Sequence, residues 1–250
     1  MPCISTLFFP ADRKMMAFMR IDALLSRYGY CSRSEAPRWV KKGRVTIQGN
    51  PVASPSQKAE PEDVLVDGAP VEFPRGIYVA FYKPLDVTCS HDDRDGTPIY
   101  DLLPPEWSER NPVVTSVGRL DKDTEGLLLV TDDGKFVHRL TSPKHHVDKV
   151  YELTTEADIP EHAVEDFASG TFTLEGEKSP CHPARLEILE ARHARLTLTE
   201  GRYHQVRRML AAVGAPVSTL KRLSIGPLHL DDLQLEAGHW TPIDPTLFEK

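Results

Sequence analysis

The chain has 250 residues, of which 40% are hydrophobic and 27% charged, and its formal net charge at pH 7 is −7. Because domains commonly hold about 100–200 residues, this length predicts one large domain, or a large one and a small one. The composition is typical of a globular protein and excludes wholesale disorder. The chain contains no run of about 18 apolar residues, which excludes a membrane-spanning helix.

The cysteines are widely spaced, and no two form a C-x-x-C pair. This spacing favours neither a disulfide framework nor a zinc site, and it is typical of a reducing cytoplasm, where we expect the protein to act. The four positions are Cys3, Cys31, Cys89 and Cys181.

The acidic average hides two basic segments. Residues 13–50 hold nine Lys or Arg against two Asp or Glu, and residues 200–226 hold five against one. Residues 155–178 are acidic, with seven Asp or Glu and one lysine, and they offset much of this positive charge. Since local fields steer a polyanion, such a charge distribution is compatible with an RNA partner.

The N-terminal part predicts a leader followed by a small unit. Residues 1–18 show no regular pattern and lack the layout of a secretory signal, so we expect a disordered leader, with a start codon placed too early as the alternative. Residues 19–74 are expected to form a separate module that begins with a helix over 20–29. A second helix is predicted with Ser34 as its N-cap, because this start keeps Pro37 in the first turn. Ser32 and Glu35 have the spacing of a capping box, but a start at Ser32 would put Pro37 inside the helix.

Short strands are predicted next, around 44–48 and 64–69, with a turn at Asn50-Pro51 and a proline-marked linker over 70–74. From residue 75 to 250, strands and helices do not alternate regularly. We therefore expect an α+β domain with a mixed, largely antiparallel sheet flanked by helices. The predicted strands are 77–82, 127–131, 150–154 and 195–199, and the predicted helices are 135–140, 163–168 and 203–213.

The densest cluster of polar residues is the segment Gly118–Gly126, G-R-L-D-K-D-T-E-G. Its alternating acids resemble half of a calcium loop, but the strand predicted after it replaces the helix that such a loop needs. They also resemble a haloacid-dehalogenase-type phosphotransferase, in which Asp121 would attack phosphorus and Asp123 would be the acid. The next acids, at 132 and 133, are too close for that fold. Taken alone, the segment is equally compatible with a charged turn between strands.

Two further segments follow, at 142–151 (S-P-K-H-H-V-D-K-V-Y) and 200–210 (E-G-R-Y-H-Q-V-R-R-M-L). In the second, a helix would direct Val206, Met209 and Leu210 to the core and leave Arg207 free to point elsewhere. By itself this is also the pattern of an ordinary amphipathic surface helix. The pair His145-His146 has no third ligand at a suitable spacing, so no metal site is expected.

Together and in this order, the three segments resemble those of the pseudouridine synthases, in the branch that modifies ribosomal RNA. The resemblance extends from Arg20 to about Asp244. It implies that Asp121 is the catalytic aspartate, that Tyr151 of K-V-Y lies against the target uracil, and that Arg207 pairs with Asp121. It also implies that residues 20–72 are the small RNA-binding module named for ribosomal protein four of the small subunit.

Residues 83–93, 142–146 and 200–209 resemble most those of the enzymes that act on 16S rRNA. The resemblance implies an enzyme that isomerises a specific uridine of 16S rRNA, free or in a small-subunit assembly intermediate, and we expect a monomer. Two alternatives stay open: a synthase acting on 23S rRNA, and a non-catalytic ribosome-assembly factor. One departure is Arg207, where this branch usually has lysine; either cation would preserve the ion pair.

Isomerising uridine involves no redox step, so no cofactor is expected. The reaction needs an ionised carboxylate, which a neighbouring Arg207 would favour, and Tyr151 would stack on the base. Arg119 is predicted to fill the space that the base vacates or to grip a phosphate, with a surface salt bridge as the alternative. His204 and Gln205 are predicted to position the substrate, with helix packing as the alternative. Lys149 and Arg202 are assigned to substrate binding with them.

Six basic residues of the small module are predicted to contact phosphates, because no acidic residue lies between Arg38 and Arg44. A solvated charged helix face is the alternative. The set comprises Arg20, Arg33, Arg38, Lys41, Lys42 and Arg44.

Overall fold

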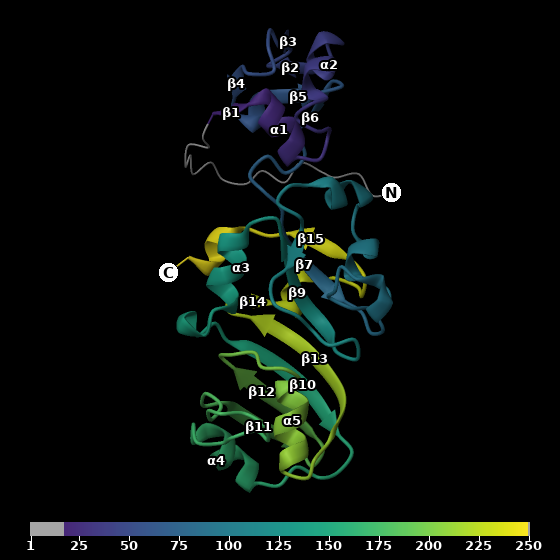
Figure 1. Cartoon of the computed structure of the whole chain (residues 1–250). Helices are drawn as coiled ribbons and strands as arrows, with labels where there is room; N and C mark the ends of the chain where they lie inside the picture. The colour runs from purple at the N-terminus through teal and green to yellow at the C-terminus, as the bar shows by residue number, and fades with distance from the viewer. Residues whose placement is uncertain (1–17, 250) are drawn as a thin grey trace. The chain divides into compact units, whose positions relative to one another are not determined.

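The computed structural model describes residues 18–249 (Figure 1). The chain divides into two compact units. The N-terminal unit contains the described residues up to Ile77 and the segment Glu106–Val114, and the C-terminal unit contains Tyr78–Pro105 and the chain from Thr115 onward. The predicted leader lies outside the described residues except for Phe18, which is exposed. No described helix has the length and apolar character needed to cross a membrane.

Two short helices of the N-terminal unit cover its core. Helix α1 spans Ile21–Arg27, and its apolar positions, Ile21, Leu24 and Leu25, are buried as the spacing predicts. Helix α2 spans Ala36–Lys41 with Pro37 in its first turn.

The predicted cap of α2 is wrong. The N-cap residue is Glu35 rather than Ser34, and no side chain caps the helix. The carboxylate of Glu35 instead accepts hydrogen bonds from the backbone N–H and the hydroxyl of Ser32, at 3.0 and 2.6 Å. The Ser32–Glu35 spacing therefore marks a real contact, although the helix begins later than a capping box requires.

The small sheet of this unit has the strand order β3-β2-β5-β6. The predicted turn at Asn50-Pro51 is wrong, since these two residues form β3 and pair with β2. The chain reverses at Gln48-Gly49, where both residues have positive φ, as a two-residue hairpin requires. The remaining strands are β2 (Val45–Ile47), β5 (Val64–Val66) and β6 (Ala69–Pro70), and a separate pair joins β1 (Met19–Arg20) to β4 (Lys58–Ala59).

The segment after β6 is packed rather than a free linker. The carbonyl of Pro74 accepts a hydrogen bond of 2.6 Å from the hydroxyl of Tyr28. Trp107, from the returning segment, is buried and meets Phe73 edge to face with ring centroids 5.5 Å apart. Asn111 N–H donates to the carbonyl of Arg27 at 2.9 Å. A short piece of chain from the middle of the sequence therefore completes the N-terminal unit.

The C-terminal unit is built on a nine-stranded sheet with the order β11-β12-β10-β13-β9-β7-β15, in which β14 pairs with β13 and β8 with β9 (Figure 1). Strands β9 and β13 run parallel, and the other neighbours are antiparallel, which confirms the predicted mixed sheet. The strands are β7 (Tyr78–Lys83), β8 (Thr115–Ser116), β9 (Glu125–Thr131), β10 (Lys149–Thr155), β11 (Arg185–Glu190), β12 (His193–Leu198), β13 (Val217–Ile225), β14 (Leu228–His229) and β15 (Trp240–Pro242).

Helices flank this sheet at separate places. Helix α3 (Gly134–Thr141) buries Phe136 and Leu140 in a core with residues of β7 and β9. Helix α4 (His162–Ala168) lies against β11, and α5 (Gln205–Ala212) lies against β13. The short α6 spans Leu230–Leu233.

Helix α5 starts two residues later than predicted. Tyr203 and His204 lie in the turn that precedes it, and His204 has a positive φ of 47°. Val206, Met209 and Leu210 are buried, as the helical spacing predicts.

Candidate active site

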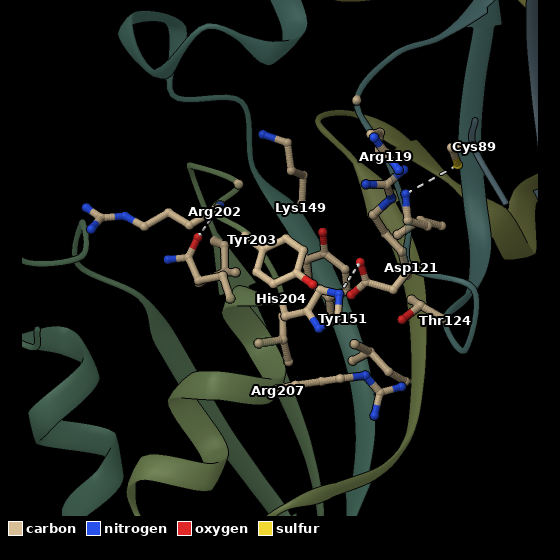
Figure 2. A pocket seen from close by; sticks show the side chains of 18 of the residues that line it. Cys89, Arg119, Asp121, Thr124, Lys149, Tyr151, Arg202, Tyr203, His204 and Arg207 are labelled. Carbon is tan, nitrogen blue, oxygen red and sulfur yellow. Dashed lines mark hydrogen bonds and ion pairs between the residues drawn. The ribbon is translucent and has the colours of Figure 1, made fainter. Parts of the chain in front are cut away.

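Much of the lining of a cavity of about 840 Å³ in the C-terminal unit comes from three segments that are distant in sequence: the loop 117–124, the start of β10 and the segment 201–207. Figure 2 shows their side chains converging, and residues of the loop 88–95 and of β13 also line the cavity. The structure thus brings together all eight residues that were predicted for catalysis or substrate binding. These are Arg119, Asp121, Lys149, Tyr151, Arg202, His204, Gln205 and Arg207.

Asp121 lies in a tight turn just before β9, which is closed by a hydrogen bond of 3.1 Å from Thr124 N–H to the carbonyl of Asp121. Its Oδ1 is 3.3 Å from Nε2 of His204, and both side chains are about one-third exposed (Figure 2). His204 reaches this position because its left-handed backbone directs it from the N-cap of α5.

The predicted ion pair between Arg207 and Asp121 is wrong. Arg207 Nη2 lies 2.9 Å from Oδ2 of Asp123 and donates to the carbonyl of the same residue at 2.9 Å. Its Nη1 donates to the carbonyl of Val217 at 3.1 Å. Residues 121–124, here called the aspartate turn, are therefore contacted by two residues at the start of α5. His204 contacts Asp121, and Arg207 binds Asp123.

The third acid of the segment 118–126 is Glu125, at the start of β9, and its Oε2 accepts a hydrogen bond of 2.8 Å from the hydroxyl of Tyr82. The acids of a calcium loop would share one centre, and among the described residues no three acidic, histidine or cysteine side chains do so. Asp133, one of the two acids judged too close to serve a phosphotransferase, caps α3 by accepting from Lys135 N–H. The geometry supports neither of these two interpretations.

Lys83 binds the backbone of the aspartate turn. It was not among the predicted site residues. Its side chain is fully buried, and Nζ donates to the carbonyls of Thr124, Pro84 and Lys122 at 2.8, 3.0 and 3.5 Å. Burial lowers the pKa of this ammonium, against the attraction of nearby acids that include Asp121 and Asp123. The signal that could have identified Lys83 is its position, since a lysine directly follows the apolar run 77–82 of a predicted buried strand.

Gly126, the second residue of β9, lets this strand approach β13 closely. Its φ is +113°, and a Cβ at this position would lie 2.3 Å from the carbonyl oxygen of Arg222 and 2.6 Å from its nitrogen. Arg222 is the parallel partner of Gly126. The glycine of D-T-E-G is therefore required for the contact between the strand that follows Asp121 and the strand that carries Arg222.

Tyr151 lies in β10 with 8% of its surface exposed, opposite Arg222 in the antiparallel register. The Arg222 guanidinium is 6.0 Å from the centroid of the Tyr151 ring, and its Nε donates to the carbonyl of Leu127 at 2.7 Å. Its Nη2 is buried and has no hydrogen-bond partner among the described residues. Sequence reasoning missed Arg222, since a lone arginine in a strand pattern carries no signal of its own.

Lys149 precedes Tyr151 by two residues and lies on the same side of β10. Its Nζ donates to the carbonyl of Val147 at 2.8 Å. Burial, and then the charge of Arg222, lower the pKa of Lys149 to about 8.

We expect Lys149→Met to raise the melting temperature at pH 7, because burying the ammonium of Lys149 is costly. The pKa is lower in the folded state than in the unfolded chain, so unfolding takes up protons between about pH 8 and 10. The stability of the wild type should therefore rise relative to that of the variant over this range, as thermal unfolding at several pH values would measure. A difference that does not change with pH would contradict the buried charge.

Arg202 and Gln205 are held in a network around Glu200. Gln205 is 4% exposed, donates to Glu200 Oε1 at 2.8 Å, and accepts from Arg202 N–H at 2.9 Å. The guanidinium of Arg202 bonds Glu200 Oε2 at 3.1 Å and the carbonyl of Ser179 at 2.8 Å. These contacts favour a packing role for Gln205, the alternative to substrate positioning. They also occupy the guanidinium of Arg202, which was predicted to bind substrate.

Arg119 is exposed at the cavity, and no described residue pairs with it, so the predicted alternative of a surface salt bridge is absent there. In the N-terminal unit, four of the six predicted phosphate contacts are exposed and form no ion pair with a described residue. These are Arg33, Arg38, Lys41 and Lys42. The other two are paired: Arg20 with Asp22 at 2.6 Å, and Arg44 with Asp67, while Arg44 also covers the Trp39 ring.

Two sequence families match the chain. Residues 77–212 match the RNA pseudouridylate synthase family, and residues 19–65 match the S4 domain.

Similar proteins span nearly the whole chain. The ribosomal small subunit pseudouridine synthase A of Pasteurella multocida is 41% identical over 88% of this chain and 94% of that protein. An uncharacterized RNA pseudouridine synthase of Bacillus subtilis is 42% identical over 85% of this chain and 90% of that protein. A crystal structure of a pseudouridylate synthase superposes with a TM-score of 0.64 at 38% identity, covering 93% of this chain and 99% of that one. This chain, with an S4 domain at its N-terminus, therefore belongs to the RNA pseudouridylate synthase family.

Proposed function

We propose that this chain isomerises a uridine of small-subunit ribosomal RNA to pseudouridine, and that Asp121 is the catalytic residue. The observation that supports this most directly is the cavity, where the carboxylate of Asp121 and the ring of Tyr151 lie together. The small-subunit substrate is supported by the name of the Pasteurella multocida relative. With such a substrate, free or partly assembled, we expect the reaction to occur in the cytoplasm and the enzyme to act as a monomer.

The reaction breaks the bond between N1 of uracil and C1′ of the sugar, and forms a bond from C5 to C1′. C5 loses a proton and N1 gains one, so no electrons enter or leave. An ionised carboxylate beside the sugar and base assists the cleavage, and Asp121 occupies that role in this proposal. Lys83 and Arg207 hold the backbone of the turn that carries Asp121, through hydrogen bonds to the carbonyls of Thr124 and Asp123.

Arg207 acts as a positioning residue. It holds the carboxylate and carbonyl of Asp123, two residues beyond Asp121, and so fixes the turn rather than touching the catalytic carboxylate. Tyr151 offers its ring to the extruded base, and its hydroxyl is available for proton removal. Flipping the base out of its stack costs about a few kcal/mol, which stacking on Tyr151 partly offsets.

The S4 domain supplies a second RNA contact through its unpaired cations. Replacing Arg33, Arg38, Lys41 and Lys42 together with glutamine should flatten the dependence of log affinity on log salt, by about 0.7–0.9 for each lost phosphate contact. Filter binding at several salt concentrations would measure the slope. A control that neutralises four exposed residues of the C-terminal unit, Lys135, Lys178, Arg185 and Arg192, should change the slope less. If log affinity had the same dependence on log salt in the wild type and in the S4 variant, these four residues would not contact RNA phosphates.

The substrate is tested by tritium release from RNA labelled at C5 of uracil, since the reaction expels that hydrogen. Small- and large-subunit ribosomal RNAs, each naked and partly assembled with proteins, are offered separately. Release from small-subunit RNA alone supports the proposal. Release from large-subunit RNA alone keeps the chemistry and contradicts the substrate, and binding without release from either would favour a non-catalytic assembly factor.

A further inference from the structure

Tyr203 is a large aromatic side chain placed in the open at the cavity. It is 77% exposed, compared with 59% for Phe18 and 51% for Leu85, and it lines the cavity together with His204 (Figure 2). Its ring stacks on the imidazole of His204 with centroids 4.0 Å apart and planes inclined by 19°. One face of the ring is therefore covered by His204.

The segment around Tyr203 is held firmly by hydrogen bonds on both sides. Arg202 N–H donates to Gln205 Oε1 at 2.9 Å, and the carbonyl of Tyr203 accepts from Arg208 Nη1 at 3.1 Å. Arg208 also binds Glu177 at 2.9 Å. The exposed ring thus projects from a fixed backbone, which reduces the entropy lost when a ligand stacks on it.

The cavity has room for more than the reacting base. Its volume of about 840 Å³ is near the upper end of the range of about 300–1,000 Å³ that is typical of sites for whole small molecules. Single-stranded RNA binds proteins by stacking successive bases on aromatic rings, which every base can do through its π-face.

We propose that Tyr203 stacks on the base of a nucleotide adjacent to the target uridine, and so positions the RNA strand at the cavity. This inference rests on the proposed function, because it needs an RNA substrate with a flipped uridine. Tyr151 would hold the target base and Tyr203 a neighbouring base, and His204, on which Tyr203 stacks, lies 3.3 Å from Asp121 in the same cavity.

The test compares Tyr203→Ala and Tyr203→Phe with the wild type on a short labelled RNA. Losing one base stack predicts a roughly 5- to 150-fold increase in KM for Tyr203→Ala, with little change in kcat. Tyr203→Phe keeps the ring and should remain within about twofold of the wild type. Leu247→Ala, at a side chain that is 50% exposed and does not line the cavity, is the matched control and should have no effect.

A second arm identifies the stacked nucleotide. RNAs with an abasic site immediately before or immediately after the target are given to wild type and Tyr203→Ala. On one of them the difference in KM between the two proteins should vanish, because the base that Tyr203 would hold is missing. A penalty that persists on both RNAs, an unchanged KM, or a fall in kcat alone would overturn the inference. A wild type that releases no tritium from any RNA would refute the proposed function instead.

Discussion

Replacing Asp121 with asparagine should lower the single-turnover rate of tritium release by at least about a thousandfold. The change preserves the shape of the side chain and removes the negative charge that the reaction needs. RNA affinity should stay the same or rise slightly, since a charge that repels phosphate is lost. Filter binding and single-turnover kinetics on the same RNA would separate the two effects.

Asp123→Asn is the matched control, two residues later in the same turn. It removes an equal charge but keeps the backbone carbonyl that Arg207 also binds, so we expect a loss of about tenfold or less. If Asp123→Asn lost as much activity as Asp121→Asn, the assignment of the catalytic carboxylate would be wrong.

Gly126→Ala should destabilise the protein strongly. The positive φ costs about 1–3 kcal/mol for a residue with a side chain, and a Cβ at 2.3 Å from the Arg222 carbonyl adds about 1–3 kcal/mol of overpacking. The expected loss in the free energy of unfolding is therefore about 2–6 kcal/mol, measured by urea denaturation. Because the parallel contact between β9 and β13 is disturbed, activity should fall as well.

Gly134→Ala provides the control for this change. Gly134 is the first residue of α3, and nothing lies within 4 Å of a Cβ built there. Alanine should be neutral or slightly stabilising at this position, by up to about 1 kcal/mol. Equal stability of the two variants would contradict the close approach of Gly126 to β13.

The sequence predicted several strands of the larger sheet, because a strand depends on a local pattern, and it predicted the cavity residues through the resemblance of three segments to a known family. Apolar runs located β7 and β9, β10 was also predicted, and the resemblance of the three segments to those of the pseudouridine synthases assigned Asp121, Tyr151 and the segment before α5. Element ends were less certain. Helix α5 begins at Gln205 because His204 takes a left-handed conformation, which no periodicity reveals.

The contacts that the sequence could not supply are those between distant segments. Arg207 pairs with Asp123 rather than with Asp121, and this contact depends on the start of α5, which lies two residues later than predicted. Arg222 lies opposite Tyr151 only through the pairing of β10 with β13, whose register includes a bulge next to Tyr151. The return of Glu106–Val114 to the N-terminal unit likewise depends on tertiary packing of Trp107.

The most direct test of the account is nucleoside analysis of small-subunit ribosomal RNA after incubation with the wild type and with Asp121→Asn. The RNA is digested completely, and uridine and pseudouridine are quantified by liquid chromatography. The account predicts that pseudouridine appears with the wild type, matched by an equal loss of uridine, and stays at background with the variant. Pseudouridine formed equally by both proteins would contradict the role of Asp121, and RNA that binds the wild type but gains no pseudouridine would contradict the activity itself.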